Sequence, residues 1–96
     1  MNSEDLHDAF EKHTDEFLKH DRIENPKHER PDLCAFLMLA ELFPGNRDIV
    51  AGASHDEIYL DIDDEEFAEK ATDDLIRDLH RCGVRHDDDG GLCMFV

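Results

Sequence analysis

Histidine is the residue type in this sequence with the most versatile chemistry, and it accounts for 7 of the 96 residues. An imidazole transfers protons near neutral pH and binds transition metals. Several histidines precede an aspartate, as in metal-dependent phosphohydrolases, but those enzymes gather several ligands inside a larger all-helical domain. In so acidic a sequence such pairs arise often by chance, and they do not predict a catalytic site. The pairs are His7-Asp8, His20-Asp21, His55-Asp56 and His86-Asp87.

A second group with ligand chemistry lies near the C-terminus. His80, Cys82, His86 and Cys93 are close in sequence, and imidazole and thiolate are ligands that zinc prefers. However, His80 and Cys82 are two positions apart in a predicted helix, so their side chains diverge, and the sequence has no Cys-x-x-Cys pair. We therefore expect a histidine at a helix end and two buried thiols in place of a zinc site.

A calcium loop and the common catalytic motifs are excluded on spacing. Asp61, Asp63 and Glu65 match the first, third and fifth positions of a calcium-binding loop. The sixth position requires glycine and holds Glu66, and the twelfth requires glutamate and holds Thr72. The sequence also has no Gly-x-Ser-x-Gly, no phosphate-binding glycine loop and no His-Glu-x-x-His. We expect no catalytic residue, no metal and no cofactor, and a protein that is not an enzyme.

Acidity is the most informative property of the chain. Its 26 acidic residues outnumber 10 Lys and Arg, which gives a formal net charge of −16. Nucleic acids and anionic membranes both need a cationic surface, so we expect neither as a direct partner. Residues 56–74 hold ten acids and a single base, Lys70, and we predict that this segment binds Lys and Arg of a basic partner protein. The predicted contacts are Asp61, Asp63, Asp64, Glu65, Glu66, Glu69, Asp73 and Asp74.

Three explanations of this acidity remain open. The carboxylates can imitate the phosphates of DNA, which place one charge every ~1.7 Å along the duplex axis, and thus occupy the basic groove of a nucleic-acid-binding protein. They can instead form a solvating coat, as in proteins from high-salt cytoplasm. They can also keep soluble a protein that binds through apolar residues. The third explanation gives the alternative function, an apolar protein-binding or homodimerising module.

The apolar pattern of the N-terminal half predicts two helices. The first carries an apolar stripe at helical spacing and ends before Pro26. The second begins at Pro31 and is apolar on almost every side as far as Phe43, which is typical of a helix in a core or an interface. The stripe of the first helix consists of Leu6, Phe10, Phe17 and Leu18.

Beyond Gly45 the apolar pattern changes to a period of two, which is typical of strands. A loop of about five residues separates the first two predicted strands, and the turn-forming residues 87–91 separate the last two, so both pairs are predicted hairpins. The predicted strands are residues 48–51, 58–63, 84–86 and 92–96.

Two consecutive helices are predicted between the hairpins. An apolar stripe follows Asp63, Thr72 can cap a second helix in its middle, and Gly83 ends that helix in a left-handed conformation. The order α-α-β-β-α-α-β-β predicts an α+β fold in which helices cover an antiparallel sheet of about four strands. With 40% apolar residues and six phenylalanines, the whole chain, residues 1–96, is expected to form a single folded domain.

The last predicted strand is apolar on both faces. Leu92, Met94 and Val96 point to one face, and Cys93 and Phe95 point to the other. Such a strand either lies inside its sheet or pairs with a second chain, for example in a homodimer. The interior position is the favoured interpretation.

The cellular location follows from what the sequence lacks. The first residues, Met-Asn-Ser-Glu-Asp, have neither the basic nor the apolar stretch of a signal peptide, and no apolar run approaches the ~20 residues of a membrane span. Three cysteines do not form a complete set of disulfides and suit a reducing compartment. The expected location is the cytoplasm.

Four segments of the C-terminal half carry a resemblance to a known group of proteins: Ile58–Asp63, Ala71-Thr72, Arg81–Arg85 and Leu92–Val96. These segments resemble small acidic accessory proteins of tailed bacteriophages, which are similar in kind to inhibitors of host defence such as anti-restriction DNA mimics and anti-CRISPR proteins. The resemblance implies a non-enzymatic inhibitor in the host cytoplasm that blocks a nucleic-acid-handling protein or a defence complex. It implies no particular target and assigns no site residue.

Overall fold

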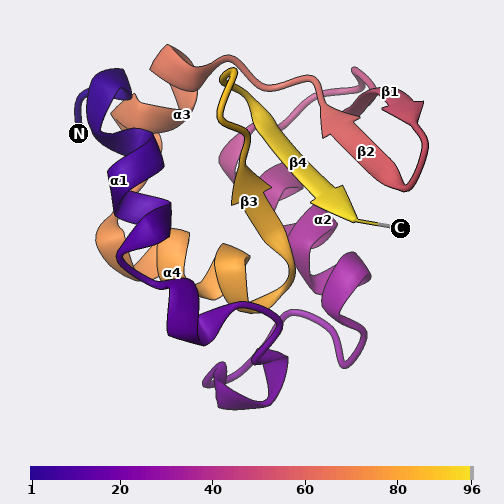
Figure 1. The fold of residues 1–96 in the computed structure, drawn as a ribbon. Coiled ribbons are helices and arrows are strands. Elements are labelled where there is room, and N and C mark those ends of the chain that lie inside the picture. The colour runs from indigo at the N-terminus through magenta and orange to yellow at the C-terminus, as the bar shows by residue number, and fades with distance from the viewer. Residues whose placement is uncertain (96) are drawn as a thin grey trace.

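The computed structural model describes residues 1–95, in which helices pack against an antiparallel sheet of four strands (Figure 1). The predicted α+β class and the two predicted hairpins are confirmed. None of the helices in residues 1–95 combines the length and the apolarity needed to cross a bilayer. The elements are η1 (Ser3–Asp5), α1 (Leu6–Glu11), η2 (Thr14–Glu16), η3 (His20–Arg22), α2 (Pro31–Leu42), β1 (Val50–Ser54), β2 (Glu57–Leu60), α3 (Asp64–Lys70), α4 (Asp73–Arg81), β3 (Val84–His86) and β4 (Leu92–Phe95), where η denotes a 3-10 helix.

The sheet has the strand order β1-β2-β4-β3, and every neighbouring pair is antiparallel. Met94 of β4 lies opposite Ile58 of β2 on one side and Val84 of β3 on the other, so β4 is an interior strand. The interior position predicted for the last strand is therefore confirmed, apart from Val96, which lies outside the described residues. β1 and β3 are the two edges of the sheet.

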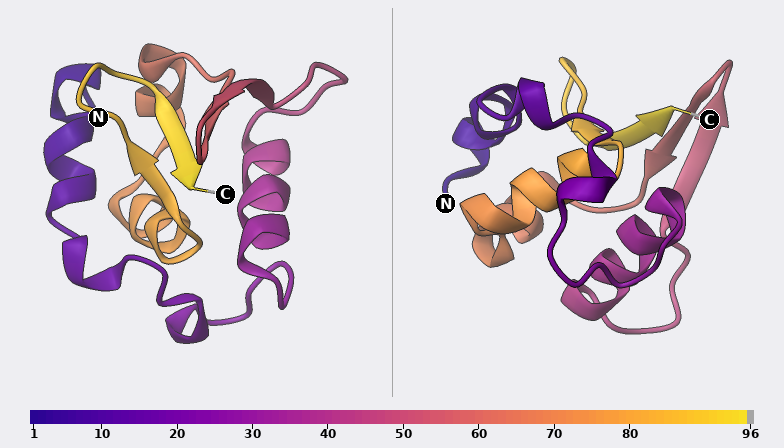
Figure 2. Two further views of the ribbon diagram at one scale, coloured as in Figure 1. Left: turned by 45° about the vertical axis from the view of Figure 1, so that its right-hand side comes forward. Right: turned by 90° about the horizontal axis from the view of Figure 1, so that it is seen from below.

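One face of the sheet packs with the helices to form the core. α2 and α4 lie on this side of the sheet, and α1 runs beside β3 (Figures 1 and 2). The apolar side chains between the sheet and the helices are buried, and removal of their surface from water is the main favourable term in folding. The fully buried members with the largest side chains are Phe67, Leu6, Leu39, Ile76, Leu79, Leu92 and Val84.

The opposite face of β4 is covered by polar side chains. Arg85 of β3 forms an ion pair with Glu57 of β2 across the strand, and its guanidinium carbon lies 4.4 Å from the centroid of the Phe95 ring. Cys93 below this pair is completely buried, whereas Phe95 remains half exposed. The core therefore covers one apolar face of β4. The ion pair covers the other face at Cys93 but not at Phe95.

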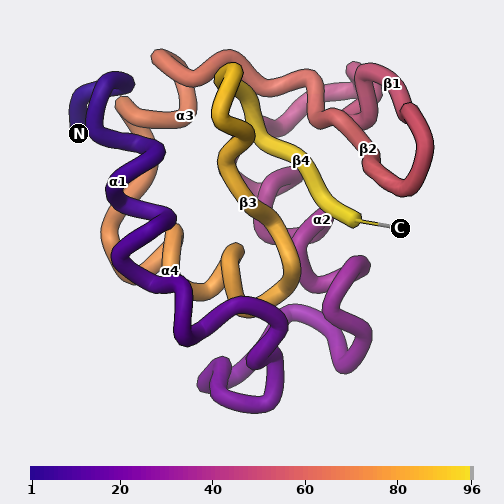
Figure 3. The backbone as a smooth tube through the Cα atoms, viewed as in Figure 1, coloured from indigo at the N-terminus to yellow at the C-terminus, as the bar shows by residue number. Residues whose placement is uncertain are grey.

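The single N-terminal helix predicted up to Pro26 is wrong. α1 ends at Glu11, and two short 3-10 helices carry the chain around the C-terminal end of α4 (Figure 3). Leu18 has a φ of 61°, its N–H donates to the carbonyl of His80 at 3.2 Å, and its side chain is exposed although the predicted stripe included it. The N–H of Leu18 thus bonds to a distant carbonyl and not within a helix, and the N-terminal helix does not continue through this residue.

The first hairpin is tighter than predicted. β1 extends to Ser54, and the turn consists of His55 and Asp56 alone, with a φ of 56° at His55. β2 ends at Leu60, so residues 61–63 lie in a connection and not in the strand predicted over residues 58–63. The small side chains of β1 allow pairing to continue to the turn, which removes the predicted five-residue loop.

The predicted break between α3 and α4 is confirmed. The Thr72 hydroxyl accepts a hydrogen bond from the N–H of Leu75 at 3.1 Å and caps α4. Gly83 has a φ of 98°, the left-handed conformation predicted for the end of this helix. Within α4, Ile76 and Leu79 are fully buried, and Leu75 is half-buried.

Candidate functional site

Two of the eight predicted contact residues, Asp63 and Asp64, accept hydrogen bonds that stabilise the fold. The Asp63 carboxylate accepts hydrogen bonds from the N–H groups of Glu65 and Glu66 and caps α3. Asp64 is half-buried, and its Oδ2 accepts from His86 Nε2 at 3.0 Å and from the N–H of Gly91 at 3.3 Å. Both carboxylates hold elements of the fold together.

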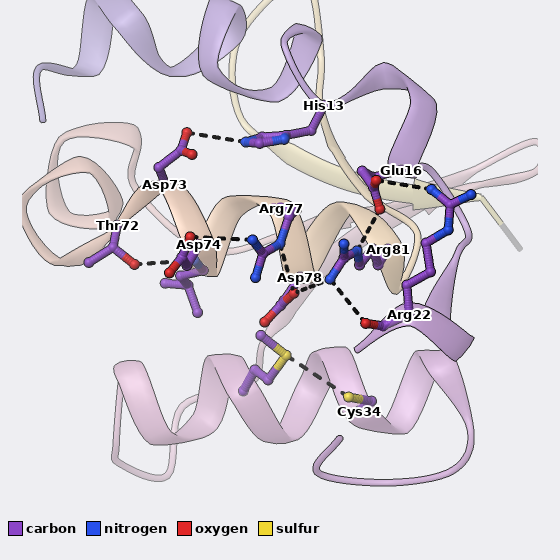
Figure 4. Close-up of polar contacts among 12 residues, drawn as sticks. His13, Glu16, Arg22, Cys34, Thr72, Asp73, Asp74, Arg77, Asp78 and Arg81 are labelled. Carbon is purple, nitrogen blue, oxygen red and sulfur yellow. Dashed lines mark hydrogen bonds and ion pairs between the residues drawn. The ribbon is translucent and has the colours of Figure 1, made fainter. Parts of the chain in front are cut away.

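Three further predicted residues form ion pairs with bases of the same chain, and two of these residues, Asp73 and Asp74, belong to α4. Figure 4 shows Asp73 with His13 and Asp74 with Arg77. Hydrogen bonds from Lys12 and His13 hold the pKa of Asp73 below its usual value, so this carboxylate stays ionised and paired. The shortest ion pair of each is Asp61–Arg47 (3.5 Å), Asp73–Lys12 (2.8 Å) and Asp74–Arg77 (3.4 Å).

The remaining three predicted residues are exposed on α3 and divide between two faces of the helix. Glu66 and Lys70 line a cavity of about 450 Å³ beside α2. Glu65 and Glu69 are four residues apart and therefore share another face. Among residues 1–95, neither Glu65 nor Glu69 forms an ion pair with Lys or Arg. The structure thus does not gather the eight predicted residues into one row, and their binding role stays a prediction.

A different set of carboxylates meets at one end of the molecule. η1 packs against α3, and Asp64 joins α3 to the β3–β4 turn (Figures 1 and 2). Each of these three segments, and α1 directly after η1, carries exposed acids. We call this surface the acidic end, and it consists of Glu4, Asp5, Asp8, Glu65, Glu69, Asp88 and Asp89.

The bases of the chain do not neutralise the acidic end. Within residues 1–95, the one ion pair made by these seven acids joins Asp88 to His7, at 3.3 Å, and no Lys or Arg takes part. Lys70 on α3 donates instead to the carbonyl of Leu42 at 2.8 Å. Seven other bases pair with carboxylates elsewhere: Lys12, Arg22, Lys27, Arg47, Arg77, Arg81 and Arg85.

Arg81 is the centre of the most extensive of these pairings, at the C-terminal end of α4 (Figure 4). Its Nε donates to Glu16 at 2.6 Å and its Nη1 donates to Asp78 at 3.1 Å, while Arg22 donates to the other oxygen of Glu16 at 3.0 Å. The hydrogen bond from Arg81 holds the pKa of Glu16 below its usual value. This network fixes the 3-10 segments onto the C-terminal end of α4.

A histidine pair links the segments of the acidic end. His7 Nδ1 and His86 Nδ1 lie 3.2 Å apart, and His86 Nε2 lies 3.0 Å from Asp64. His7 Nε2 is within 3.2 Å of Glu11 and 3.3 Å of Asp88. The network therefore joins α1, β3, α3 and the β3–β4 turn through side chains alone.

The Asp64 carboxylate sets the orientation of the His86 ring. A carboxylate only accepts, so His86 donates from Nε2 to Asp64, and its Nδ1 faces His7 Nδ1. Both nitrogens of each imidazole therefore have a neighbour inside the protein within hydrogen-bond distance.

The four residues considered for zinc lie apart. His80 donates from Nδ1 to the carbonyl of Val84, His86 belongs to the network above, and Cys93 lies on the opposite face of the sheet. Burial raises the pKa of the thiols of Cys82 and Cys93, so both stay protonated at neutral pH. Nowhere in residues 1–95 do three His, Cys, Asp or Glu side chains converge in a way that suits a metal ion.

No local pattern indicates the pairing of His7 with His86, since 79 positions separate them. Its His-Asp dipeptides include both residues, but the structure pairs His86 with Asp64 and not with its neighbour in sequence. Comparison of the chain with models of protein families, with curated proteins and with solved structures gave no match.

Proposed function

We propose that this protein is a non-enzymatic inhibitor that binds a basic nucleic-acid-binding protein or host defence complex through the acidic end. The observation that carries the proposal is the convergence of exposed carboxylates from η1, α1, α3 and the β3–β4 turn, without a Lys or Arg paired to them in residues 1–95. The phage resemblance of the C-terminal half supports a host protein as the target. Glu65 and Glu69 of the acidic end also belong to the contacts predicted from the sequence.

Electrostatics supports this choice of partner. No Lys or Arg of residues 1–95 compensates the carboxylates of the acidic end, and the net charge of −16 adds a field that attracts a cationic protein. Complementary charge accelerates association and selects partners, and it weakens as salt increases. A groove that normally holds DNA phosphates is cationic, and the acidic end would compete with DNA for it.

Two charge-matched variants test the proposal. Asp8→Asn, Glu65→Gln and Glu69→Gln together form the acidic-end variant, and each of these side chains is exposed. The control variant removes the same number of charges on another part of the surface. Its substitutions, also at exposed residues, are Asp21→Asn, Glu24→Gln and Glu29→Gln.

The measurement is capture of partners from a bacterial lysate on immobilised wild type and both variants, with elution by salt and by duplex DNA. Wild type and the control variant should retain a DNA-handling or defence protein that duplex DNA releases, and the acidic-end variant should lose it. Equal retention by both variants, or a partner that DNA does not release, would contradict the proposal.

An apolar binding module is the second candidate, because α2 and β1 expose apolar side chains. Leu33 and Leu37 share one face of α2 and are 42% and 44% exposed, and Val50 of β1 is 42% exposed. Phe36 and Ile49 line an open hollow between these elements together with Val50. In this case Leu33→Gln with Leu37→Gln would abolish capture, and binding would be nearly independent of salt.

A further inference from the structure

A cavity of about 340 Å³ lies between α1 and β3, on a side of the molecule that the proposed function does not use except at Asp88. Ligand sites for small molecules usually begin near this volume. Three phenylalanine rings contribute to its walls, so most of the surface that it offers is apolar. The residues used below are Phe10, Glu11, Phe17, His80, Asp88 and Phe95.

His80 presents an unpaired hydrogen-bond acceptor in this cavity. Its side chain is 7% exposed, and its Nδ1 lies 2.9 Å from the carbonyl of Val84. A carbonyl only accepts, so the proton is on Nδ1. Burial lowers the pKa of His80, so the ring is neutral at pH 7 and Nε2 carries a lone pair. In residues 1–95 no donor reaches this nitrogen.

Two phenylalanine rings pack against His80 at the cavity. The His80 ring lies 4.9 Å from the Phe17 ring and 5.7 Å from the Phe10 ring, centroid to centroid. Aromatic rings at these separations attract one another in tilted and edge-to-face arrangements. A further aromatic ring in the cavity would extend this cluster toward Phe95.

Each charged side chain that lines the cavity forms an ion pair inside the protein, so the ligand need not carry a charge; Nε of Arg85 is the atom of these groups that has no hydrogen-bond partner in residues 1–95. Burying an uncompensated charge in such surroundings would be costly, whereas a neutral ring would gain from the apolar walls. The internal pairs are Glu11–His7, Asp88–His7, His86–Asp64 and Arg85–Glu57.

We infer that this cavity binds a neutral aromatic ring with one hydrogen-bond donor, such as a phenol, whose hydroxyl donates to Nε2 of His80. The three phenylalanines contact the ring of the ligand. Nε2 of His80 offers one lone pair and therefore accepts from one donor. The occupant is either a free small molecule or a tyrosine side chain of a partner protein. The inference does not depend on the role of the acidic end.

Phenol and anisole are the matched probes, since methylation of the oxygen removes the donor and changes the ring little. Each is titrated into the full chain while the imidazole signals of His80 are followed by NMR. We expect saturable binding of phenol with a shift of the His80 Nε2 resonance, and about tenfold weaker binding of anisole because the buried acceptor stays unpaired. Equal affinities for the two, or phenol shifts that leave His80 unchanged, would overturn the inference.

A variant tests the acceptor directly. His80→Phe keeps a ring between Phe10 and Phe17 and removes the lone pair, so the preference for phenol over anisole should disappear. If this variant does not fold, the probe pair on the wild-type chain still decides the question.

A competition experiment distinguishes the two sources of the aromatic group. Phenol is added to wild-type protein that holds a captured partner. Release of the partner identifies a tyrosine side chain as the occupant, and retention identifies a free small molecule. The salt and DNA elution described above tests the acidic end separately, so either proposal can fail while the other stands.

Discussion

At the scale of single residues, Asp64 lies beside the acidic end and connects more of the structure than the carboxylates of that surface. Its Oδ2 accepts from both His86 and Gly91, and the His86 ring continues the contact to His7. Its other oxygen, Oδ1, is buried without a hydrogen bond in residues 1–95. The residue therefore acts in folding, and we assign partner binding to exposed neighbours such as Glu65.

Replacement of Asp64 tests this structural role. Asp64→Ala leaves His86 Nε2 and the N–H of Gly91 without their acceptor, and we expect it to lower the free energy of unfolding by about 1–3 kcal/mol in urea denaturation. Asp64→Asn keeps one carbonyl oxygen and should cost less. Glu65→Gln, on the same helix and exposed, is the control and should leave stability unchanged. An alanine variant as stable as wild type would contradict the role.

His80 gives a prediction about pH. Burial lowers its pKa in the folded protein below the usual value of about 6.5, which the unfolded chain retains. As the pH falls below about 6.5, the unfolded state takes up a proton that the folded state does not. The contribution of His80 to stability is therefore fully present above the pKa of the unfolded chain and is lost as the pH falls below it.

The test compares wild type with His80→Gln, which cannot titrate, by urea denaturation at several values between pH 7.5 and pH 5.5. Wild type should lose more stability over this interval than the variant, because all other groups titrate in both proteins. Parallel curves for the two proteins would show that His80 titrates normally in the folded state.

The His7–His86 pair shows the limit of prediction at this scale. Each histidine stood out in the sequence as part of a His-Asp dipeptide, yet nothing local indicates that the two rings meet. Their contact depends on α1 lying beside β3, which is a property of the packed core. In contrast, the cap at Thr72 was predictable, because a cap involves only residues three positions apart.

At the scale of elements, local signals predicted the second half of the chain better than the first. Gly83 and Thr72 mark helix boundaries through their own backbone and hydroxyl, and both boundaries were predicted. The N-terminal helix was predicted too long because its end depends on Leu18, whose N–H bonds to the distant carbonyl of His80. A pattern of apolar residues cannot report such a tertiary contact.

The Thr72 cap can be tested at this scale. Thr72→Ala removes the acceptor for the N–H of Leu75 at the start of α4 and should lower the free energy of unfolding by about 1 kcal/mol. Thr72→Ser keeps a hydroxyl at the same position and should remain close to wild type. Equal losses in the two variants, measured by urea denaturation, would mean that the methyl group and not the cap is responsible.

At the scale of the whole molecule, the distribution of charge matters more than its total. Bases elsewhere on the chain pair with acids of their own surroundings, while no Lys or Arg of residues 1–95 pairs with a carboxylate of the acidic end. Net charge was evident from the sequence, but its division into paired and unpaired regions required the fold. This explains why only Glu65 and Glu69 are shared between the contacts predicted from the sequence and the acidic end.

The most direct measurement of the central claim is the salt dependence of binding between a captured partner and three proteins: wild type, the acidic-end variant and the control variant. Affinity for wild type and for the control should fall steeply and in parallel as salt increases, since ions screen charges that attract across the interface. The acidic-end variant should bind more weakly at low salt and show a shallower slope. The same slope for all three proteins would contradict the claim that the acidic end forms the binding surface.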